Sequence, residues 1–142
     1  MDPFFAFAAI VGLLSTSIGM IEYIDGVRNA PKDLLALRAN LRQAQTSLEQ
    51  LRGFLAQNAY PHGSFIDSWP EKTQDLVINH GVIDSYKEQL RGLKTKLENR
   101  NGMKKWIQYV HWPKTKNAVK DMSDRIQRLQ GNIVLALQMD NA

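Results

Sequence analysis

Three stretches of this 142-residue chain repeat apolar residues at alternating steps of three and four positions. The most regular stripe comprises Leu34, Leu37, Leu41, Ala44, Leu48, Leu51 and Leu55. The other two comprise Leu76, Asn79, Ile83, Tyr86, Leu90, Leu93 and Leu97, and Val119, Met122, Ile126, Leu129, Ile133 and Ala136. This spacing places each stripe on one face of an α-helix. The chain therefore contains three amphipathic helices that must bury these faces, and no strand-like alternation of useful length accompanies them.

A fourth helix precedes these three. We predict that it runs from about Asp2 to Arg28, with Pro3 at the first helical position, where a missing N–H costs nothing. Asn29-Ala30-Pro31 breaks it and starts the second helix, which ends near residue 58. Residues 58–70 are predicted as a loop, 71–100 as the third helix and 103–112 as a possible short helix. Trp112-Pro113 precedes the final stripe.

Four long helices with short connections predict an all-α, up-down four-helix bundle. The length suits a single domain over residues 1–142. We expect it to be the N-terminal part of a longer protein.

The first helix is unusually apolar, because residues 3–21 (PFFAFAAIVGLLSTSIGMI) contain no charge. Their length approaches the roughly 20 residues needed to span a bilayer. Asp2 is the only charged side chain before them, which argues against a secretory signal. The run is a constitutive span, a buried core helix, or a helix that changes between the two states. Its candidate membrane-inserting residues are Phe4, Phe5, Phe7, Ile10, Val11, Leu13, Leu14, Ile18 and Ile21.

Small residues recur along the same helix at helical spacing, namely Ala8, Gly12, Ser15, Thr16 and Gly19. Such a face lets another helix approach closely. We expect Ala8, Gly12, Ser15 and Gly19 to form a helix-packing face, either inside a soluble bundle or between helices in a membrane.

The net charge of +4 lies entirely in the second half of the chain. Residues 1–60 hold five acids and five bases, whereas residues 87–120 hold ten Lys or Arg against Glu88 and Glu98. Basic residues near tryptophan are typical of membrane interfaces, although a solvated basic face is an equal interpretation. The candidate anionic-lipid-binding residues are Lys94, Lys96, Arg100, Lys104, Lys105, Lys114, Lys116 and Lys120. No nucleic-acid-binding motif accompanies them, so no specific nucleic acid is expected.

Catalytic and metal-binding patterns are missing from the sequence. There is no cysteine, and His62, His80 and His111 lie far apart without metal-ligand spacing. No phosphate-binding glycine loop or nucleophile elbow is present. We therefore expect no enzyme activity, no cofactor, no metal and no small-molecule substrate.

Two segments carry a resemblance to a known family. The opening MDPFFAFAAIVGLLSTSIGMIEYIDGVRNAPKDLLALRANL and the closing WPKTKNAVKDMSDRIQRLQGNIVLALQ, which ends in an Ala136-Leu137 pair, resemble the HeLo-like N-terminal domains of fungal NLR-type immune receptors. The resemblance implies a helical bundle related to the four-helix domain of the mixed-lineage kinase-like pseudokinase. It also implies programmed cell death, as in heterokaryon incompatibility and innate immunity, in which the activated domain oligomerises, exposes its first helix and permeabilises membranes.

Three functional hypotheses follow. The first is a membrane-permeabilising cell-death domain, cytoplasmic at rest and at the plasma membrane on activation, whose partners are anionic lipids and other copies of itself. Glu22 and Asp25 would then lie at the water boundary, and a charge at Leu13 or Ile18 would abolish activity. The second is a signalling adaptor that binds a related helical domain without touching lipid. The third is a constitutive single-span anchor.

Overall fold

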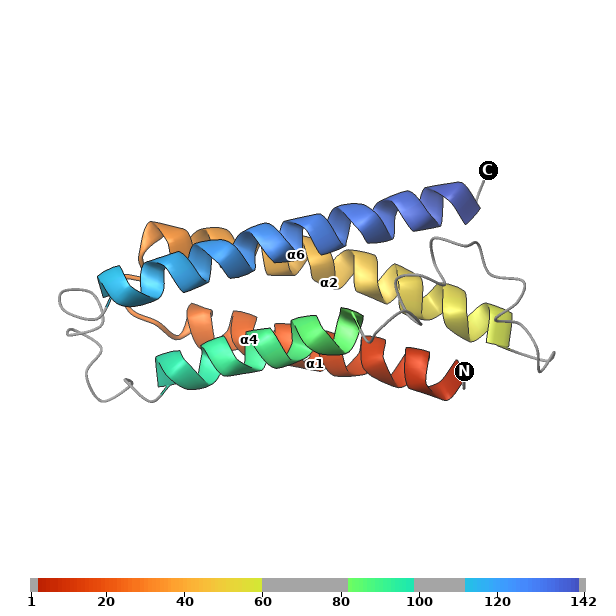
Figure 1. Ribbon diagram of the computed structural model, residues 1–142, viewed down its shortest axis with the longest axis horizontal. Coiled ribbons are helices and arrows are strands. Elements are labelled where there is room, and N and C mark those ends of the chain that lie inside the picture. The colour runs from red at the N-terminus through yellow and green to blue at the C-terminus, as the bar shows by residue number, and fades with distance from the viewer. Residues whose placement is uncertain (1–2, 60–81, 99–111, 141–142) are drawn as a thin grey trace.

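The computed structural model describes residues 3–59, 82–98 and 112–140. They form α1 (Pro3–Asp25), α2 (Lys32–Ala59), α4 (Val82–Glu98) and α6 (Trp112–Asp140). Within these residues the chain has four long helices and no strand. The predicted all-α four-helix bundle is therefore confirmed, with successive helices alternating in direction (Figure 1).

The order of the helices around the bundle differs from their order in the sequence. The helix pairs that pack most closely are α1 with α2, α2 with α6, α4 with α6, and α1 with α4. Going around the bundle, the order is thus α1, α2, α6, α4 (Figure 1). Each helix consequently has one antiparallel and one parallel neighbour.

The α2/α6 pair is parallel and in heptad register. Asn40 bonds to Ser123 and Ser47 bonds to Gln130, and both pairs are separated by 83 positions in the sequence. Seven residues before Asn40 and Ser123, Asp33 pairs with Lys116. Polar residues inside a helical seam specify its register. These three contacts therefore fix how α6 lies along α2.

The predicted apolar stripes form the core. The fully buried side chains include Leu37, Leu41, Leu48, Leu51, Ile83, Leu90, Leu97, Val119, Ile126 and Ile133, together with Ile10, Leu13, Met20 and Ile24 from α1. Tyr86 is half-buried against this cluster. The side chains of Leu55 and Ala136, and residues Leu76 and Asn79, lie outside the described part of the chain. The heptad prediction is thus confirmed wherever the structure describes its members.

The first helix ends earlier than predicted, at Asp25 instead of Arg28. The Gly26 amide still donates to the Glu22 and Tyr23 carbonyls, but the Val27 amide reaches back only to Ile24, which closes a tight turn. Asn29 then adopts a φ of 56°, a left-handed conformation that asparagine tolerates better than most residues. The turn ends the helix because the chain must reverse direction into α2.

The remaining boundaries follow the prediction where they can be compared. The Pro31 carbonyl accepts from the Leu34 and Leu35 amides, so Pro31 caps the start of α2 at Lys32. Helix α2 continues through Ala59, so the loop predicted over 58–70 starts no earlier than residue 60. The rest of that loop, the third helix before Val82, and the short helix expected near 103–112 lie outside the described residues.

Candidate functional site

Helix α1 has two apolar faces, and only one of them is buried. The buried face comprises Ile10, Leu13, Leu14, Ser17, Met20, Ile21 and Ile24. On the opposite face the side chains of Val11 and Ile18 are 38% and 37% exposed, and Ala8 and Ser15 lie exposed between them at helical spacing. We call Ala8, Val11, Ser15 and Ile18 the outer stripe. Apolar side chains on this stripe lack the neighbours that the buried face has within the described residues.

The candidate membrane-inserting residues are therefore divided between the two faces. Ile10, Leu13, Leu14 and Ile21 are core residues, and Val11 and Ile18 belong to the outer stripe. The side chains of Phe4, Phe5 and Phe7 lie outside the described part, although their backbone is helical. Leu13 and Ile18 are both predicted to insert into a membrane, but Leu13 is buried in the bundle and Ile18 is exposed on its surface.

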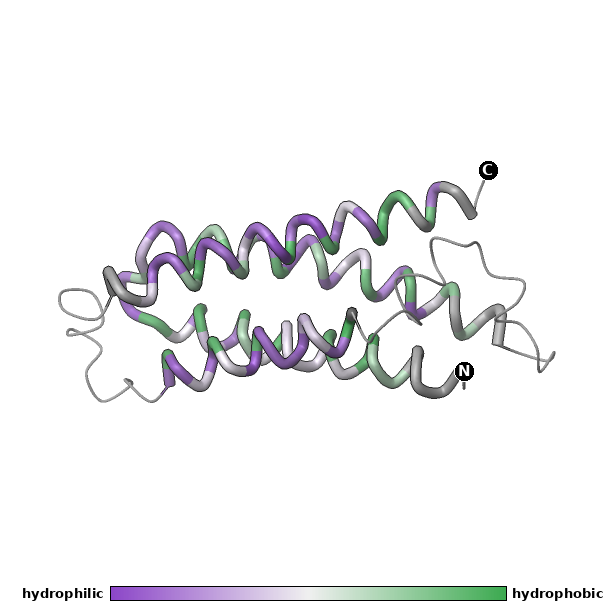
Figure 2. Tube along the Cα trace, viewed as in Figure 1, coloured by the Kyte–Doolittle hydropathy of each residue, from purple (hydrophilic) through white to green (hydrophobic). Residues whose placement is uncertain are grey.

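The hydropathy of α1 distinguishes it from the other described helices. Ala8–Asp25 is a window of 18 residues with a mean hydropathy of 1.3, long and apolar enough to cross a membrane, and 39% of it is buried. The tube in Figure 2 is largely white and green along α1, whereas α2 and α6 alternate purple and green. Core helices of soluble proteins meet the same criterion. The composition therefore allows both environments.

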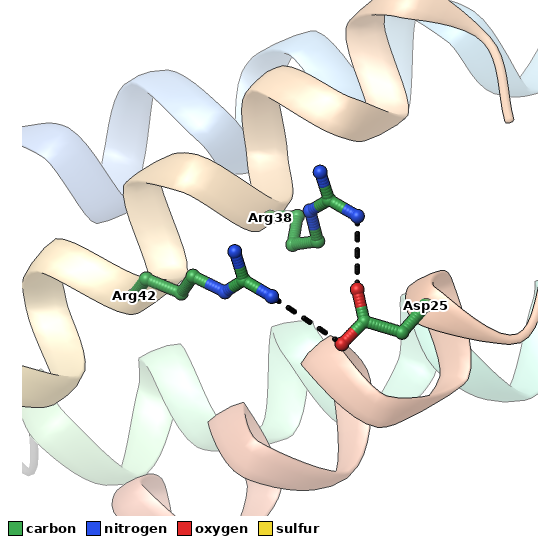
Figure 3. Close-up of polar contacts among 3 residues, drawn as sticks. All are labelled: Asp25, Arg38 and Arg42. Carbon is green, nitrogen blue, oxygen red and sulfur yellow. Dashed lines mark hydrogen bonds and ion pairs between the residues drawn. The ribbon is translucent and has the colours of Figure 1, made fainter.

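Polar attachment of α1 to the bundle is confined to its C-terminal end. Asp25 accepts from Arg38 Nη1 at 2.9 Å and from Arg42 Nη2 at 3.4 Å, one carboxylate oxygen for each arginine of α2 (Figure 3). A carboxylate at a helix C-terminus opposes the helix dipole, and the two guanidinium groups offset this. Among the described side chains of α1, Asp25 alone makes a hydrogen bond or ion pair to another helix.

The α1/α4 pair is parallel, like α2/α6, but its contacts are of another kind. A Cβ built on Gly12 would lie 3.2 Å from Lys87 Cδ, and one built on Gly19 would lie 3.4 Å from Lys94 Nζ. Both glycines and both lysines are seven residues apart, which gives the pair its register. The predicted small face is thus divided: Gly12 and Gly19 lie under lysine side chains, whereas Ala8 and Ser15 are exposed.

One polar group in the buried face of α1 has no partner. Ser17 is fully buried, and its Oγ makes no hydrogen bond within the described part of the chain. Leaving a buried hydroxyl unpaired costs about 1–3 kcal/mol. By contrast, the buried Ser47 and Ser123 of the α2/α6 pair are both hydrogen-bonded. Helix α1 therefore buries an unpaired hydroxyl, whereas these two hydroxyls of the α2/α6 pair are paired.

Tyr23 lies near the same end of α1 as Asp25 and faces α4. Burial raises the pKa of Tyr23 above its usual value of 10.0, and the nearby negative charge of Glu98 raises it further. Both effects favour the neutral phenol in the folded protein.

The candidate lipid-binding residues whose side chains the structure describes differ in their surroundings. Lys94 is directed toward α1 and pairs with Glu98, whereas Lys116 pairs with Asp33 of α2. Lys96 and Lys120 are exposed. Arg100, Lys104 and Lys105 lie outside the described residues, as does the side chain of Lys114. The end of α4 and the start of α6 nevertheless lie at the same end of the bundle as the α1–α2 turn (Figure 1).

The described residues contain no cluster of metal-ligating side chains. No group of three His, Asp or Glu side chains there is arranged to hold a metal ion. A shallow groove between α4 and α6 is lined by Gln89, Gly92, Leu93, Lys96, Ala118, Asp121, Met122 and Arg125. Arg125 donates to Gln89 across it, and the groove contains no arrangement suited to general acid–base catalysis.

Sequence reasoning did not identify Lys87, the Asp25 contacts or Ser17 as parts of this site. The matching seven-residue spacings of Gly12 to Gly19 and Lys87 to Lys94 were a usable signal. The spatial order of the helices, which brings α4 beside α1, was needed to interpret it. Comparison of the chain with protein-family models, curated proteins and solved structures finds no match.

Proposed function

We propose that this protein is a membrane-permeabilising cell-death domain, similar to the HeLo-like domains that its terminal segments resemble. In this proposal α1 is packed in the bundle of a cytoplasmic protein at rest. After oligomerisation at the plasma membrane it leaves the bundle and inserts. The observation that carries the proposal is that α1 is apolar on two faces and has polar attachments to other helices at one end only, among its described side chains.

The cost of releasing α1 is mainly the exposure of its buried apolar face. Burial of apolar surface is worth about 25 cal/mol per Å², and a bilayer interior returns that free energy. The outer stripe gains as well, because Val11 and Ile18 are already exposed to water in the bundle. Transfer of α1 into a membrane therefore buries both faces, whereas the bundle buries one.

The position of the attached end also favours this route. Asp25, with Arg38 and Arg42, lies near the 26–31 turn. This turn is at the same end of the bundle as the C-terminus of α4 and the N-terminus of α6, which carry the candidate lipid-binding residues (Figure 1). Each basic residue near an anionic surface contributes about 1 kcal/mol of attraction. If this end meets the membrane, α1 can rotate about the turn while its polar end, with Glu22 and Asp25, stays at the water boundary.

Oligomerisation would use the outer stripe. Ala8, Val11, Ser15 and Ile18 follow the steps of three and four that suit packing against a second helix. Several copies bound together add their membrane affinities, which matters because one moderately apolar helix is a weak anchor.

A signalling adaptor is the second candidate. It is favoured by the complete burial of four α1 side chains, Ile10, Leu13, Met20 and Ile24. They pack in the core as the side chains of a helix in a soluble bundle do. In that case the partner would be a related helical domain, and α1 would never leave.

The test is dye release from vesicles of equal parts phosphatidylserine and phosphatidylcholine. Ile18→Glu places a charge on the outer stripe, and Leu35→Glu is a matched control, because the two side chains are 37% and 38% exposed. We expect Ile18→Glu to lose release and Leu35→Glu to keep it, with both bundles folded by circular dichroism. Equal release by both variants would contradict insertion of the outer stripe, and no release by any oligomeric form would favour the adaptor.

A further inference from the structure

Two lysines of α4 lie across α1 at its glycines. A Cβ at Gly12 would be 3.2 Å from Lys87 Cδ and 3.6 Å from its Nζ, and a Cβ at Gly19 would be 3.4 Å from Lys94 Nζ. Any larger residue at Gly12 would force the lysine to move. We call the surfaces of Gly12 and Gly19 the glycine sockets. The Gly12 socket leaves room that a Cβ would take from Lys87, whereas a Cβ at Gly19 would make ordinary contact with Lys94 Nζ.

The charges of these lysines are not satisfied by α1. The side chains are only 24% and 34% exposed, and their acidic partners are Asp84 at 3.8 Å and Glu98 at 3.3 Å, both on α4 itself. The Lys87 stem and the Lys94 ammonium therefore lie against α1 by packing alone, and both side chains are partly removed from water. A lysine can keep its stem on an apolar surface only while no stronger anion draws its head group away.

We propose that Lys87 and Lys94 form a latch over α1 that phosphate groups open. An ammonium group binds phosphate oxygens through charge-assisted hydrogen bonds, and the phosphate region of an anionic bilayer presents many at once. Withdrawing both stems uncovers the α1/α4 seam without breaking any described hydrogen bond or ion pair between these helices. The inference rests on the proposed function, since it makes the lipid surface the signal that releases the inserting helix.

A single-cysteine reporter tests the latch directly. The chain contains no cysteine, and Ser17 is fully buried with an unpaired hydroxyl. Ser17→Cys therefore places the only thiol of the protein where a water-soluble maleimide reaches it after α1 has moved. Ser47→Cys, in the α2/α6 seam, reports on opening of the rest of the bundle.

The expected result is that phosphatidylserine vesicles speed labelling of Ser17→Cys by about tenfold or more, with little effect on Ser47→Cys. Vesicles of phosphatidylcholine alone should have a much smaller effect. Lys87→Met with Lys94→Met keeps an apolar stem on each socket and removes the charges. This variant should remain protected without lipid and lose the acceleration. Arg52→Met with Arg128→Met removes the same charge from exposed positions that are not candidate lipid contacts, and this variant should keep most of the acceleration.

Equal acceleration in the two double variants would overturn the latch, as would the absence of acceleration in the parent protein. Acceleration by inorganic phosphate alone would support the latch and identify free phosphate as a sufficient source. The two proposals fail separately. Vesicle-dependent labelling without dye release would contradict the proposed function and leave the latch standing. Dye release without a lysine-dependent change in labelling would contradict the latch and leave the proposed function standing.

Discussion

The bundle consists of two parallel helix pairs that are held together in different ways. Between α2 and α6, Asn40 bonds to Ser123 and Ser47 bonds to Gln130 inside the seam. Between α1 and α4, glycines lie under lysine side chains, and the buried Ser17 has no partner in the described structure. Both pairs contribute buried leucines and isoleucines to the core. The difference teaches that apolar burial gives both pairs their stability, while α2/α6 alone has, among the described residues, hydrogen bonds inside the seam as well.

The largest expected effect comes from shortening a core leucine in each pair. Leu13 and Leu41 are both fully buried, so Leu→Ala at either should cost about 2–5 kcal/mol. We expect Leu41→Ala to move one cooperative urea transition to lower concentration. Leu13→Ala should broaden the transition, because α1 leaves before the rest unfolds. Circular dichroism during urea unfolding checks this, and equal shifts with unchanged slopes would contradict the difference between the pairs.

The serines allow a comparison of one residue type in both pairs. Ser17→Ala removes an unpaired buried hydroxyl, so the free energy of unfolding should stay the same or rise by up to about 1 kcal/mol. Ser123→Ala leaves Asn40 without its hydroxyl partner and should lower the free energy of unfolding by about 1 kcal/mol. Thermal and urea unfolding of both variants measure the signs. A loss of stability in Ser17→Ala would mean that its hydroxyl has a partner.

The attachment at Asp25 should have a smaller effect. Its contacts with Arg38 and Arg42 are partly exposed, so Asp25→Asn should lower the free energy of unfolding by about 0.2–1 kcal/mol, and less at high salt. Asp33→Asn, which breaks a single 3.8 Å contact with Lys116, is the matched change in the other pair and should cost less. Unfolding at two salt concentrations tests this order. A larger loss for Asp33→Asn would reverse it.

The smallest effect concerns Tyr23 at high pH. Because its pKa is raised in the folded protein, the folded state retains the proton more tightly than the unfolded chain. The contribution to stability is therefore complete below pH 10 and is lost as the pH rises above that value. Tyr23→Phe should flatten this alkaline decrease, measured as the free energy of unfolding against pH. An identical slope in the variant would exclude Tyr23 as its source.

The sequence predicted the helices well and their arrangement less well. Stripes such as Leu34 to Leu51 identify helix and buried face together, because the spacing is a local property of the chain. The spatial order α1, α2, α6, α4 depends on which faces fit in three dimensions, and no local pattern encodes it. For the same reason Ile18 and Leu13 looked equivalent: α1 is apolar on both faces, so its composition cannot indicate which face is buried.

Native-state amide hydrogen exchange, resolved by helix and without lipid, tests the central claim most directly. The claim is that the α1/α4 pair can open while the α2/α6 pair stays folded. It predicts that amides of α1 around Leu13 and of α4 around Leu90 exchange through an opening of lower free energy than that of global unfolding. Amides around Leu48 and Ile126 should exchange only with global unfolding. Exchange of all four helices at one common free energy would contradict the claim.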